Sequence, residues 1–433
     1  MKYMLSAITL ALASTGYAAD LKSQLGDDIK AIQPQVVAWR RDFHQHPELS
    51  NREQRTAQVV ATELKKLGLK VQTGVAKHGV VAILEGGKPG PMVALRADMD
   101  ALPVVEQVDL PFASKVTSEF NGQQVGVMHA CGHDAHVAML LGAATVLSKH
   151  QKELTGSVMF VFQPAEEGPP AGEEGGAKLM LKEGLFAKRK PDAIFGLHVW
   201  PGPSGQLLVR PEGSMAAADT FEITVKGVQT HGSSPWRGVD PISVTGQLIT
   251  ALQQIPARQL DITKAPAVVS IGQIQAGVRW NIIPDKVNLG GTVRTFDPQM
   301  REQLLEKMAR TTEHIAAASG ATADFKYHNA AAVTWNNASL TEWAMPSLKW
   351  AGAQAGVAPI APITASEDFS FYQQQVPGVF LFLGIAEPGV PVEKTAPNHS
   401  PFFKLYEPAM ENGVRALTAL AVDYLQQAPA IKQ

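Results

Sequence analysis

Hydrophobic positions in the first half of the chain follow two alternating spacings. Helical spacing places apolar side chains on one face between Val59 and Leu67, and Gly68 ends that segment. A second helix is predicted from Asp134, whose side chain could cap it. Uninterrupted apolar runs, typical of strands buried on both faces, occur at 80–84, 92–95, 158–162, 193–197 and 379–383. This alternation predicts an α/β fold in which helices flank a mixed sheet.

The pattern changes near Asp219. Apolar and polar residues alternate between Phe221 and Val225, as in a half-buried strand. Asp240 and Pro241 then cap and start a helix. The segments that follow complete the order β-α-β-β-α-β, which is typical of a ferredoxin-like domain. We therefore expect an inserted domain at 213–328, and an α/β domain whose two parts are 20–212 and 329–433.

The first nineteen residues have the features of a signal peptide. Lys2 precedes an apolar run at 4–13, and small residues follow up to Ala19. The run is too short for a bilayer span, which needs roughly 20 residues. We expect cleavage after Ala18 or Ala19 and export to the periplasm or the medium. No other apolar stretch is long enough to predict a membrane span.

Composition narrows the classes of partner. Charged residues make up 18% of the 433 residues, and the net charge is −2. Such a balanced charge argues against nucleic acid as a partner. The single cysteine, Cys131, excludes an intrachain disulfide.

That cysteine lies in the most concentrated motif of the chain, HACGHDAH at 129–136. Thiolate and imidazole are good ligands for divalent metals of intermediate softness, and Gly132 allows a tight turn between the donors. A bound metal would also explain why an exported chain tolerates one unpaired thiol. The alternative is a buried free cysteine beside histidines that cap a helix.

Two acidic motifs follow predicted strands. Glu166 and Glu167 come just after the run at 158–162, where α/β sheets place their sites. Adjacent carboxylates in an extended chain point in different directions, so one could bind metal while the other acts on a water molecule. Asp98 and Asp100, after the run at 92–95, could bind metal or orient a ligand histidine. Solvated or loop-capping carboxylates are the alternatives. His198, His231 and His399, each taken alone, are more often structural than catalytic.

Eight motifs between residues 96 and 401 occur in a characteristic order: RADMDALP, HACGHDAH, QPAEEG, GLHVWP, THGSSP, NIIPD, SEDF and NHSP. Their combination resembles the M20 family of metallopeptidases and amidohydrolases. It is most similar to the branch of N-acyl-amino-acid amidohydrolases, which includes hippurate hydrolases and indole-3-acetyl-amino-acid hydrolases. The resemblance covers essentially the whole mature chain. HxCGHD with PAEE downstream marks this branch, because other members typically have Asp in place of Cys131.

The resemblance implies two divalent metal ions per subunit, with zinc or manganese expected and cobalt or nickel also suited to the donors. The ligands that it implies are Cys131, His133, Glu167, His198 and His399. Glu166 would be the general base, and Asp100 would orient a ligand without binding metal itself. The inserted domain would be the family's lid or dimerisation domain, so a homodimer through this domain is possible. In that domain His231 and Asn281 would polarise the scissile carbonyl, and Arg294 would hold the substrate's α-carboxylate.

These implications predict hydrolysis of the amide bond of N-acyl-L-amino acids, such as hippurate and related conjugates, to a carboxylic acid and an amino acid. An exported metallo-dipeptidase or carboxypeptidase is the alternative within enzymes, because a peptide bond differs little from this amide. A non-catalytic, metal-containing binding protein is the alternative from another class.

Overall fold

The computed structural model describes residues 2–431, with side chains from Leu21 onward. The predicted signal peptide at 1–19 therefore lies outside the described side chains. The chain divides into two compact units. Unit 1 comprises Met1–Pro211, Asn336–Ile360 and Tyr372–Gln433, and unit 2 comprises Glu212–Trp335 and Ala361–Phe371.

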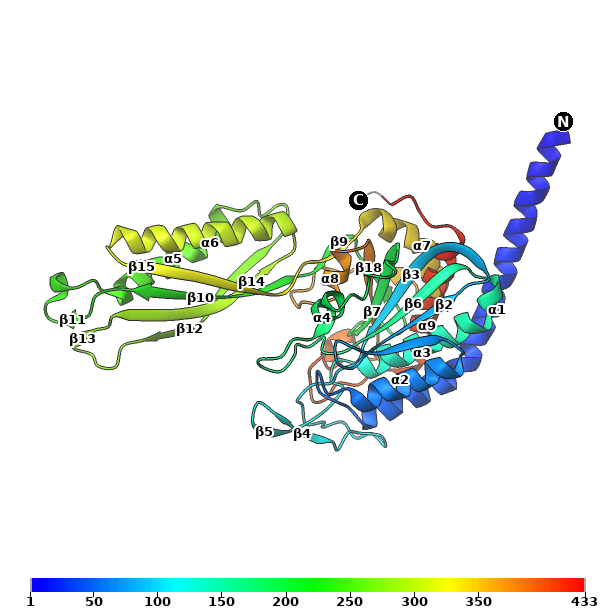
Figure 1. Cartoon of the computed structure of the whole chain (residues 1–433), viewed down its shortest axis with the longest axis horizontal. Coiled ribbons are helices and arrows are strands. Elements are labelled where there is room, and N and C mark those ends of the chain that lie inside the picture. Colours follow the sequence, from blue (N-terminus) through cyan, green and yellow to red (C-terminus); the bar gives the residue numbers. More distant parts are fainter. Residues whose placement is uncertain (1, 432–433) are drawn as a thin grey trace. The chain divides into compact units, whose positions relative to one another are not determined.

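An eight-stranded mixed sheet forms the centre of unit 1, in the order β1-β2-β6-β3-β7-β18-β8-β17 (Figure 1). The four central strands run parallel, and their apolar side chains are buried on both faces. They are β6 (Thr155–Gln163), β3 (Lys88–Asp98), β7 (Ala193–Trp200) and β18 (Gly378–Gly384). The outer strands are β1 (Lys70–Val75), β2 (Gly79–Glu85), β8 (Leu207–Leu208) and β17 (Val357–Ala358). The predicted mixed sheet is confirmed.

Helices in unit 1 are arranged around α3 (His133–Lys149), which carries the HACGHDAH motif into the core. Nearly every side chain of α3 is buried, because the helix contacts the sheet as well as α1 (Lys2–Gln45) and α9 (Met410–Gln426). The other α-helices of unit 1 in the described residues are α2 (Gln54–Lys66), α4 (Gly176–Lys182) and α7 (Ala338–Gly352), and the short α8 (Ser370–Gln373) lies where the chain passes from unit 2 back to unit 1. Among the residues that the structure describes, no helix combines the length and the apolar character that a membrane span requires.

The prediction that Asp134 caps α3 is wrong. The helix begins at His133, and its N-cap is Gly132, at a φ of 88°. Asp134 is buried in the first turn, where it accepts a hydrogen bond from Arg40 Nε at 2.8 Å and lies 2.8 Å from His44 Nδ1. Burial alone would raise the pKa of Asp134, but the charges of Arg40 and His44 outweigh it and hold this pKa well below its usual value. The carboxylate therefore ties α3 to α1 instead of capping the helix.

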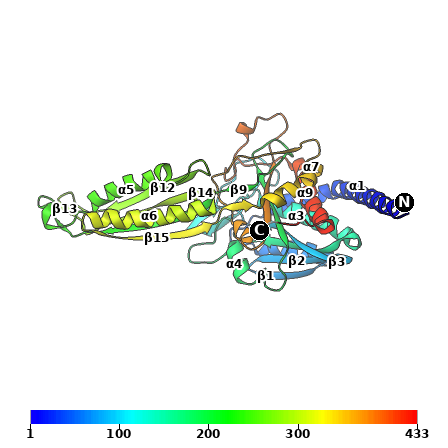
Figure 2. The ribbon, with the colours of Figure 1, turned by 90° about the horizontal axis from the view of Figure 1, so that it is seen from above.

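Unit 2 contains the predicted β-α-β-β-α-β order. Its antiparallel sheet has the order β12-β14-β10-β15, and two helices cover one face (Figure 2). Phe221, Ile223 and Val225 point from β10 into the core under these helices, as their alternation predicted. Asp240 caps α5 by accepting a hydrogen bond from the Ile242 N–H at 2.9 Å. The elements are β10 (Ala217–Lys226), α5 (Pro241–Arg258), β12 (Ala267–Ala276), β14 (Lys286–Thr295), α6 (Pro298–Ala318) and β15 (Thr322–Ala331).

Shorter elements complete the two units. In unit 2, β11 (Thr230–His231) pairs with β13 (Ile282–Ile283). A two-residue turn at Asn121 and Gly122 joins a hairpin in unit 1. The remaining strands and 3-10 helices are β4 (Thr117–Phe120), β5 (Gln123–Gly126), β9 (Glu212–Met215), β16 (Thr334–Asn336), η1 (Gln151–Glu153), η2 (Pro235–Arg237), η3 (Val392–Lys394) and η4 (Glu407–Ala409).

Candidate metal centre

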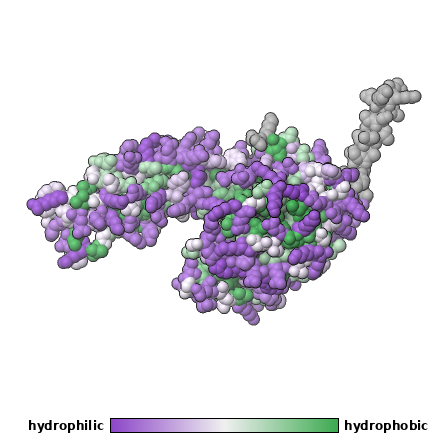
Figure 3. Space-filling model, viewed as in Figure 1, coloured by the Kyte–Doolittle hydropathy of each residue, from purple (hydrophilic) through white to green (hydrophobic). Residues whose placement is uncertain are grey.

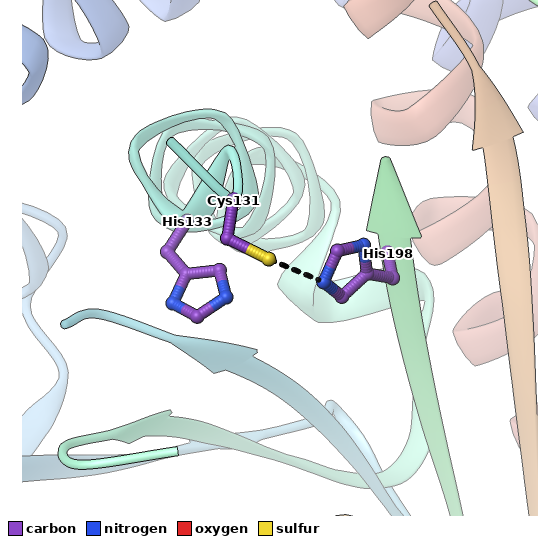
Figure 4. A group of neighbouring side chains, drawn as sticks. All are labelled: Cys131, His133 and His198. Carbon is purple, nitrogen blue, oxygen red and sulfur yellow. Dashed lines mark hydrogen bonds between the residues drawn. The ribbon is translucent and has the colours of Figure 1, made fainter. Parts of the chain in front are cut away.

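The five metal ligands implied by the resemblance come together in unit 1, near the carboxyl ends of its central strands. Cys131 lies just before α3 and His133 is the first residue of this helix, and the Cys131 sulfur points toward His198 on β7 (Figure 4). The Cys131 Sγ is 3.4 Å from the His198 Nε2. Glu167 follows β6, and its Oε1 is 3.1 Å from the Nε2 of His399, which lies in a loop after β18.

Donor atoms of these residues form overlapping groups. In each group the atoms lie within 4.8 Å of one another. Three of the groups are Cys131–His133–His198, Cys131–Glu167–His399 and His133–Glu166–Glu167, and His133 also forms a group with Asp98 and His136. Cys131 belongs to two of these groups, so its sulfur can contribute a donor atom at both ends of the cluster.

The chemistry of these donors fits divalent metal ions. The Nε2 of His133 is buried and has no hydrogen-bond partner among the residues that the structure describes, which is costly unless a ligand compensates. Burial, followed by the charges of Glu167 and Glu166, raises the pKa of the Cys131 thiol well above its usual value. A thiolate therefore needs a cation here. Thiolate, imidazole and carboxylate are together the donor set of zinc and its neighbours.

His198 is oriented for ligation by its other ring nitrogen. Its Nδ1 lies 2.7 Å from the carbonyl oxygen of Val199. Because a carbonyl only accepts, Nδ1 carries the proton and Nε2 keeps the lone pair that faces Cys131. Burial, assisted by the nearby His136, lowers the pKa of His198 well below its usual value, so the ring is neutral.

His136 and Asp98 lie close to His133, and their hydrogen bonds hold β7 beside the centre. The Val199 N–H donates to the His136 Nε2 at 2.8 Å, and the His136 Nδ1 lies 2.5 Å from the Asp98 Oδ1. Both ring nitrogens are thereby used, so His136 holds β7 beside the centre instead of binding metal. Sequence reasoning gave His136 no role and could not choose a role for Asp98. Their contacts depend on residues that are far apart in the chain.

Asn398, in the NHSP motif, is a second residue that sequence reasoning left without a role. Its Nδ2 donates to the carbonyl oxygens of Cys131 and Val199, at 3.1 and 3.3 Å. These bonds join the loop of His399 to α3 and β7. Its place beside a ligand histidine was the one available signal.

Asp100 lies next to His133, one of the ligands that the resemblance implies. Its Oδ1 is 3.3 Å from the His133 Nδ1, and its Oδ2 accepts a hydrogen bond from the Ser50 hydroxyl at 2.7 Å. Burial would lower the pKa of His133, but Asp98 and Asp100 reverse this and raise it to about 10. The surrounding carboxylates thus favour a positive charge at this position, which a metal ion would supply.

Unit 2 contains the three remaining residues and brings only two of them together. His231 pairs with Ile282 across β11 and β13, and the Gly232 N–H donates to the Asn281 carbonyl oxygen at 2.9 Å. Arg294 is on β14, eight residues beyond Lys286, which follows β13 closely. At about 3.4 Å per residue, Arg294 lies about 27 Å along this strand from the end that is next to β13. The structure therefore separates Arg294 from His231 and Asn281.

Replacing Gly132 by Ala is expected to lower the free energy of unfolding by at least about 2 kcal/mol. Two effects add: the strain of a left-handed backbone conformation in a residue with a Cβ, and the crowding of that Cβ against its neighbours. The φ of Gly132 is 88°, and an added Cβ would lie 2.3 Å from Val199 Cγ2 and 3.2 Å from Phe403 Cζ. Urea unfolding measures the loss. Gly172→Ala is the matched control, because Gly172 also has a positive φ but nothing lies within 4 Å of the added Cβ. Equal losses in the two variants would contradict the crowding.

Comparison with known proteins identifies the family of the chain. The model of peptidase family M20/M25/M40 matches residues 94–423. The chain is 40% identical to thermostable carboxypeptidase 2 of Saccharolobus solfataricus, over 94% of this chain and 99% of the relative. It is 38% identical to N-acetylcysteine deacetylase of Bacillus subtilis, over 92% and 98% of the two chains.

A solved structure supports the same relationship. The Bacillus subtilis YxeP protein, described as a dinuclear metal binding peptidase from the M20 family, superposes with a TM-score of 0.76. Its sequence is 37% identical, and the match covers 92% of this chain and 99% of that chain. Because the family model spans most of the chain and these relatives match it almost end to end, the protein belongs to peptidase family M20/M25/M40, as one of its metal-dependent amidohydrolases.

Proposed function

We propose that the protein hydrolyses the amide bond of N-acyl-L-amino acids and uses two divalent metal ions held in unit 1. The observation that carries this proposal is the placement of two adjacent carboxylates beside the donor cluster. Both carboxylates have an oxygen 3.9 Å from the His133 Nε2, but Glu167 Oε1 also lies 3.1 Å from the His399 Nε2. One carboxylate can therefore bind metal while its neighbour handles protons. Zinc or manganese is our proposal for the metal.

Each residue then has a defined task. Metal ions held by Cys131, His133, Glu167, His198 and His399 would supply Lewis acidity for the carbonyl and for water. Glu166 accepts the proton of the attacking water and delivers it to the leaving amine. His231 and Asn281 donate hydrogen bonds to the carbonyl oxygen as it becomes negative. The planar guanidinium of Arg294 suits the two oxygens of the α-carboxylate.

A substrate panel tests the reaction. Metal-loaded protein is incubated with hippurate, N-acetyl amino acids, an indoleacetyl-amino acid and unblocked dipeptides, with and without a chelator, and released amino acid is quantified. We expect cleavage of the blocked substrates only, abolished by the chelator. A relative named as a deacetylase of N-acetylcysteine supports this preference. The relative named as a carboxypeptidase supports the alternative, and cleavage mainly of unblocked dipeptides would establish that alternative.

We also propose a homodimer through unit 2. Within one copy of unit 2, Arg294 lies too far from His231 for both to touch one small N-acyl amino acid, so a second copy must supply one of them. The end of unit 2 near His231 offers a surface for pairing, since Val278 and Trp280 are 98% and 95% exposed. Figure 3 shows hydrophobic patches among hydrophilic ones at the end that carries β11 and β13. Such exposed apolar groups mark interaction surfaces.

Mixing two inactive variants checks this assignment. Glu166→Gln and His231→Ala proteins, each inactive alone, are expected to regain partial activity when their subunits are exchanged, because one site of the mixed dimer has both residues intact. Sedimentation measures the dimer in the same samples. A mixed dimer that stays inactive would contradict the supply of His231 by the partner.

We also propose that the segment at 1–19 directs export of the protein to the periplasm or the medium.

A further inference from the structure

The turn that carries Glu166 and Glu167 has an unusual backbone. Ala165 precedes the two glutamates, is buried, and has a φ of 53°. A residue with a Cβ rarely adopts this left-handed conformation, and it persists only where the surroundings hold it. The conformation of Ala165 sets the directions in which the next two residues, Glu166 and Glu167, leave the turn. The groups that contact the Ala165 backbone therefore help to set the positions of these two carboxylates.

Three successive backbone amides in this turn donate to two buried carboxyl groups. The Ala165 N–H donates to Glu53 Oε1 at 2.8 Å. The Glu166 and Glu167 N–H groups donate to Asp100 Oδ1 and Oδ2, at 3.1 and 3.0 Å. Runs of amides that alternate between right- and left-handed conformations form concave anion sites. Here side chains of the protein accept all three hydrogen bonds, and only Asp100 belongs to a motif noted in the sequence.

Glu53 is itself held firmly. It is fully buried at the N-cap of α2, and its Oε1 also accepts a hydrogen bond from the Asn51 N–H at 2.9 Å. Asn51 is left-handed too, with a φ of 62°. One carboxyl oxygen thus joins two strained turns, one before α2 and one beside the metal centre. Burial, with the nearby charge of Asp100, raises the pKa of Glu53 to about 8, so the group is mainly neutral at pH 7.

We propose that Glu53 is a positioning residue for the reaction: by fixing Ala165 in its left-handed conformation, it directs the Glu166 and Glu167 side chains to their separate tasks. This inference rests on the proposed role of Glu166 as the base. Glu53 belongs to none of the donor groups of the centre, so its effect on the reaction passes through the turn.

A purely structural role, capping α2, makes a different prediction. Glu48 provides the matched control, because its carboxylate accepts the Arg55 and Thr56 N–H groups at the start of the same helix, at 2.9 and 2.8 Å. Glu48→Ala removes a capping group without touching the turn at Ala165. It is expected to lower the unfolding temperature and to leave kcat unchanged.

The test compares metal-loaded, full-length Glu53→Ala, Glu53→Gln and Glu48→Ala proteins with the wild type. We expect Glu53→Ala to lower kcat by about 10–100-fold with little change in KM, since a small misplacement of a reacting group has effects of this size. Amide hydrogen exchange across 163–168 should become faster. Glu53→Gln should restore both the rate and the slow exchange, because its carbonyl oxygen can accept the same two N–H groups.

Several outcomes would overturn the proposal: near-wild-type kcat in Glu53→Ala, unchanged exchange at 163–168, or a loss of kcat in Glu48→Ala as large as in Glu53→Ala. If Glu53→Ala does not fold, Glu53→Asp replaces it, because its shorter side chain cannot reach both amides and should lose activity while Glu53→Gln keeps it. A wild type inactive on the whole panel would instead refute the proposed function, and the exchange measurement would still decide whether Glu53 holds the turn.

Discussion

Glu166→Gln is expected to lower kcat by about 10²–10⁴-fold, the range typical of a lost general acid–base group, while bound metal stays unchanged. Glutamine keeps the shape and the hydrogen-bonding reach of the side chain, but it cannot take a proton from water. Its backbone N–H would still donate to Asp100, as that of Glu166 does at 3.1 Å. Initial rates on the best substrate of the panel, together with elemental analysis, measure both quantities.

Two neighbours in the same segment make this experiment specific. Glu167→Gln should lower metal content as well as rate, because Glu167 Oε1 is the atom that faces His399. Glu174→Gln should change neither, since its exposed carboxylate pairs only with Lys182 among the ion pairs seen in the described residues. Turnover close to that of the wild type in Glu166→Gln would exclude Glu166 as the base.

The periodicity of the sequence predicted the central strands well, because side chains buried on both faces of a sheet must be apolar along the whole run. The periodicity missed segments that pair with a neighbouring strand without forming a long apolar run. β3 begins at Lys88, earlier than the apolar run at 92–95, because Lys88 pairs with Thr155 on the neighbouring strand β6. β8 and β17 have two residues each, too few for any spacing to be recognised.

At the metal centre, the sequence identified groups of residues but could not separate their roles. HACGHDAH contains His133 and His136, which are chemically identical and three residues apart. The structure separates them because the Val199 N–H, from a distant strand, uses the His136 Nε2. Glu53 gave no signal, since an acidic residue before a helix is ordinary capping chemistry. Such roles depend on tertiary contacts, which no local pattern contains.

The family resemblance likewise named His231, Asn281 and Arg294 without their spacing. The resemblance gives all three residues a role at one substrate. The ten-residue strand β14, however, places Arg294 far from the other two within one copy of unit 2. The motifs give the order of these residues along the chain, but the length of the strand between them sets their separation in space.

Cys131→Ala is expected to lower the content of both metal ions, and activity should fall with it. Its sulfur belongs to the groups Cys131–His133–His198 and Cys131–Glu167–His399, so a single substitution removes a donor at both ends of the cluster. His198→Ala removes a donor from only one of them. Elemental analysis of desalted protein should therefore show a larger loss of metal in Cys131→Ala than in His198→Ala.

The metal should also stabilise the folded state, because it binds donors that unit 1 assembles. At a free metal concentration about 1,000 times the Kd, this linkage contributes about 4 kcal/mol, which a chelator would remove together with activity. His150→Ala is the matched control: this histidine pairs with Asp28 at 2.8 Å and belongs to none of the donor groups, so metal content should not change. Two ions retained in Cys131→Ala would return Cys131 to the role of a buried thiol and leave the carboxylates and histidines to hold the metal alone.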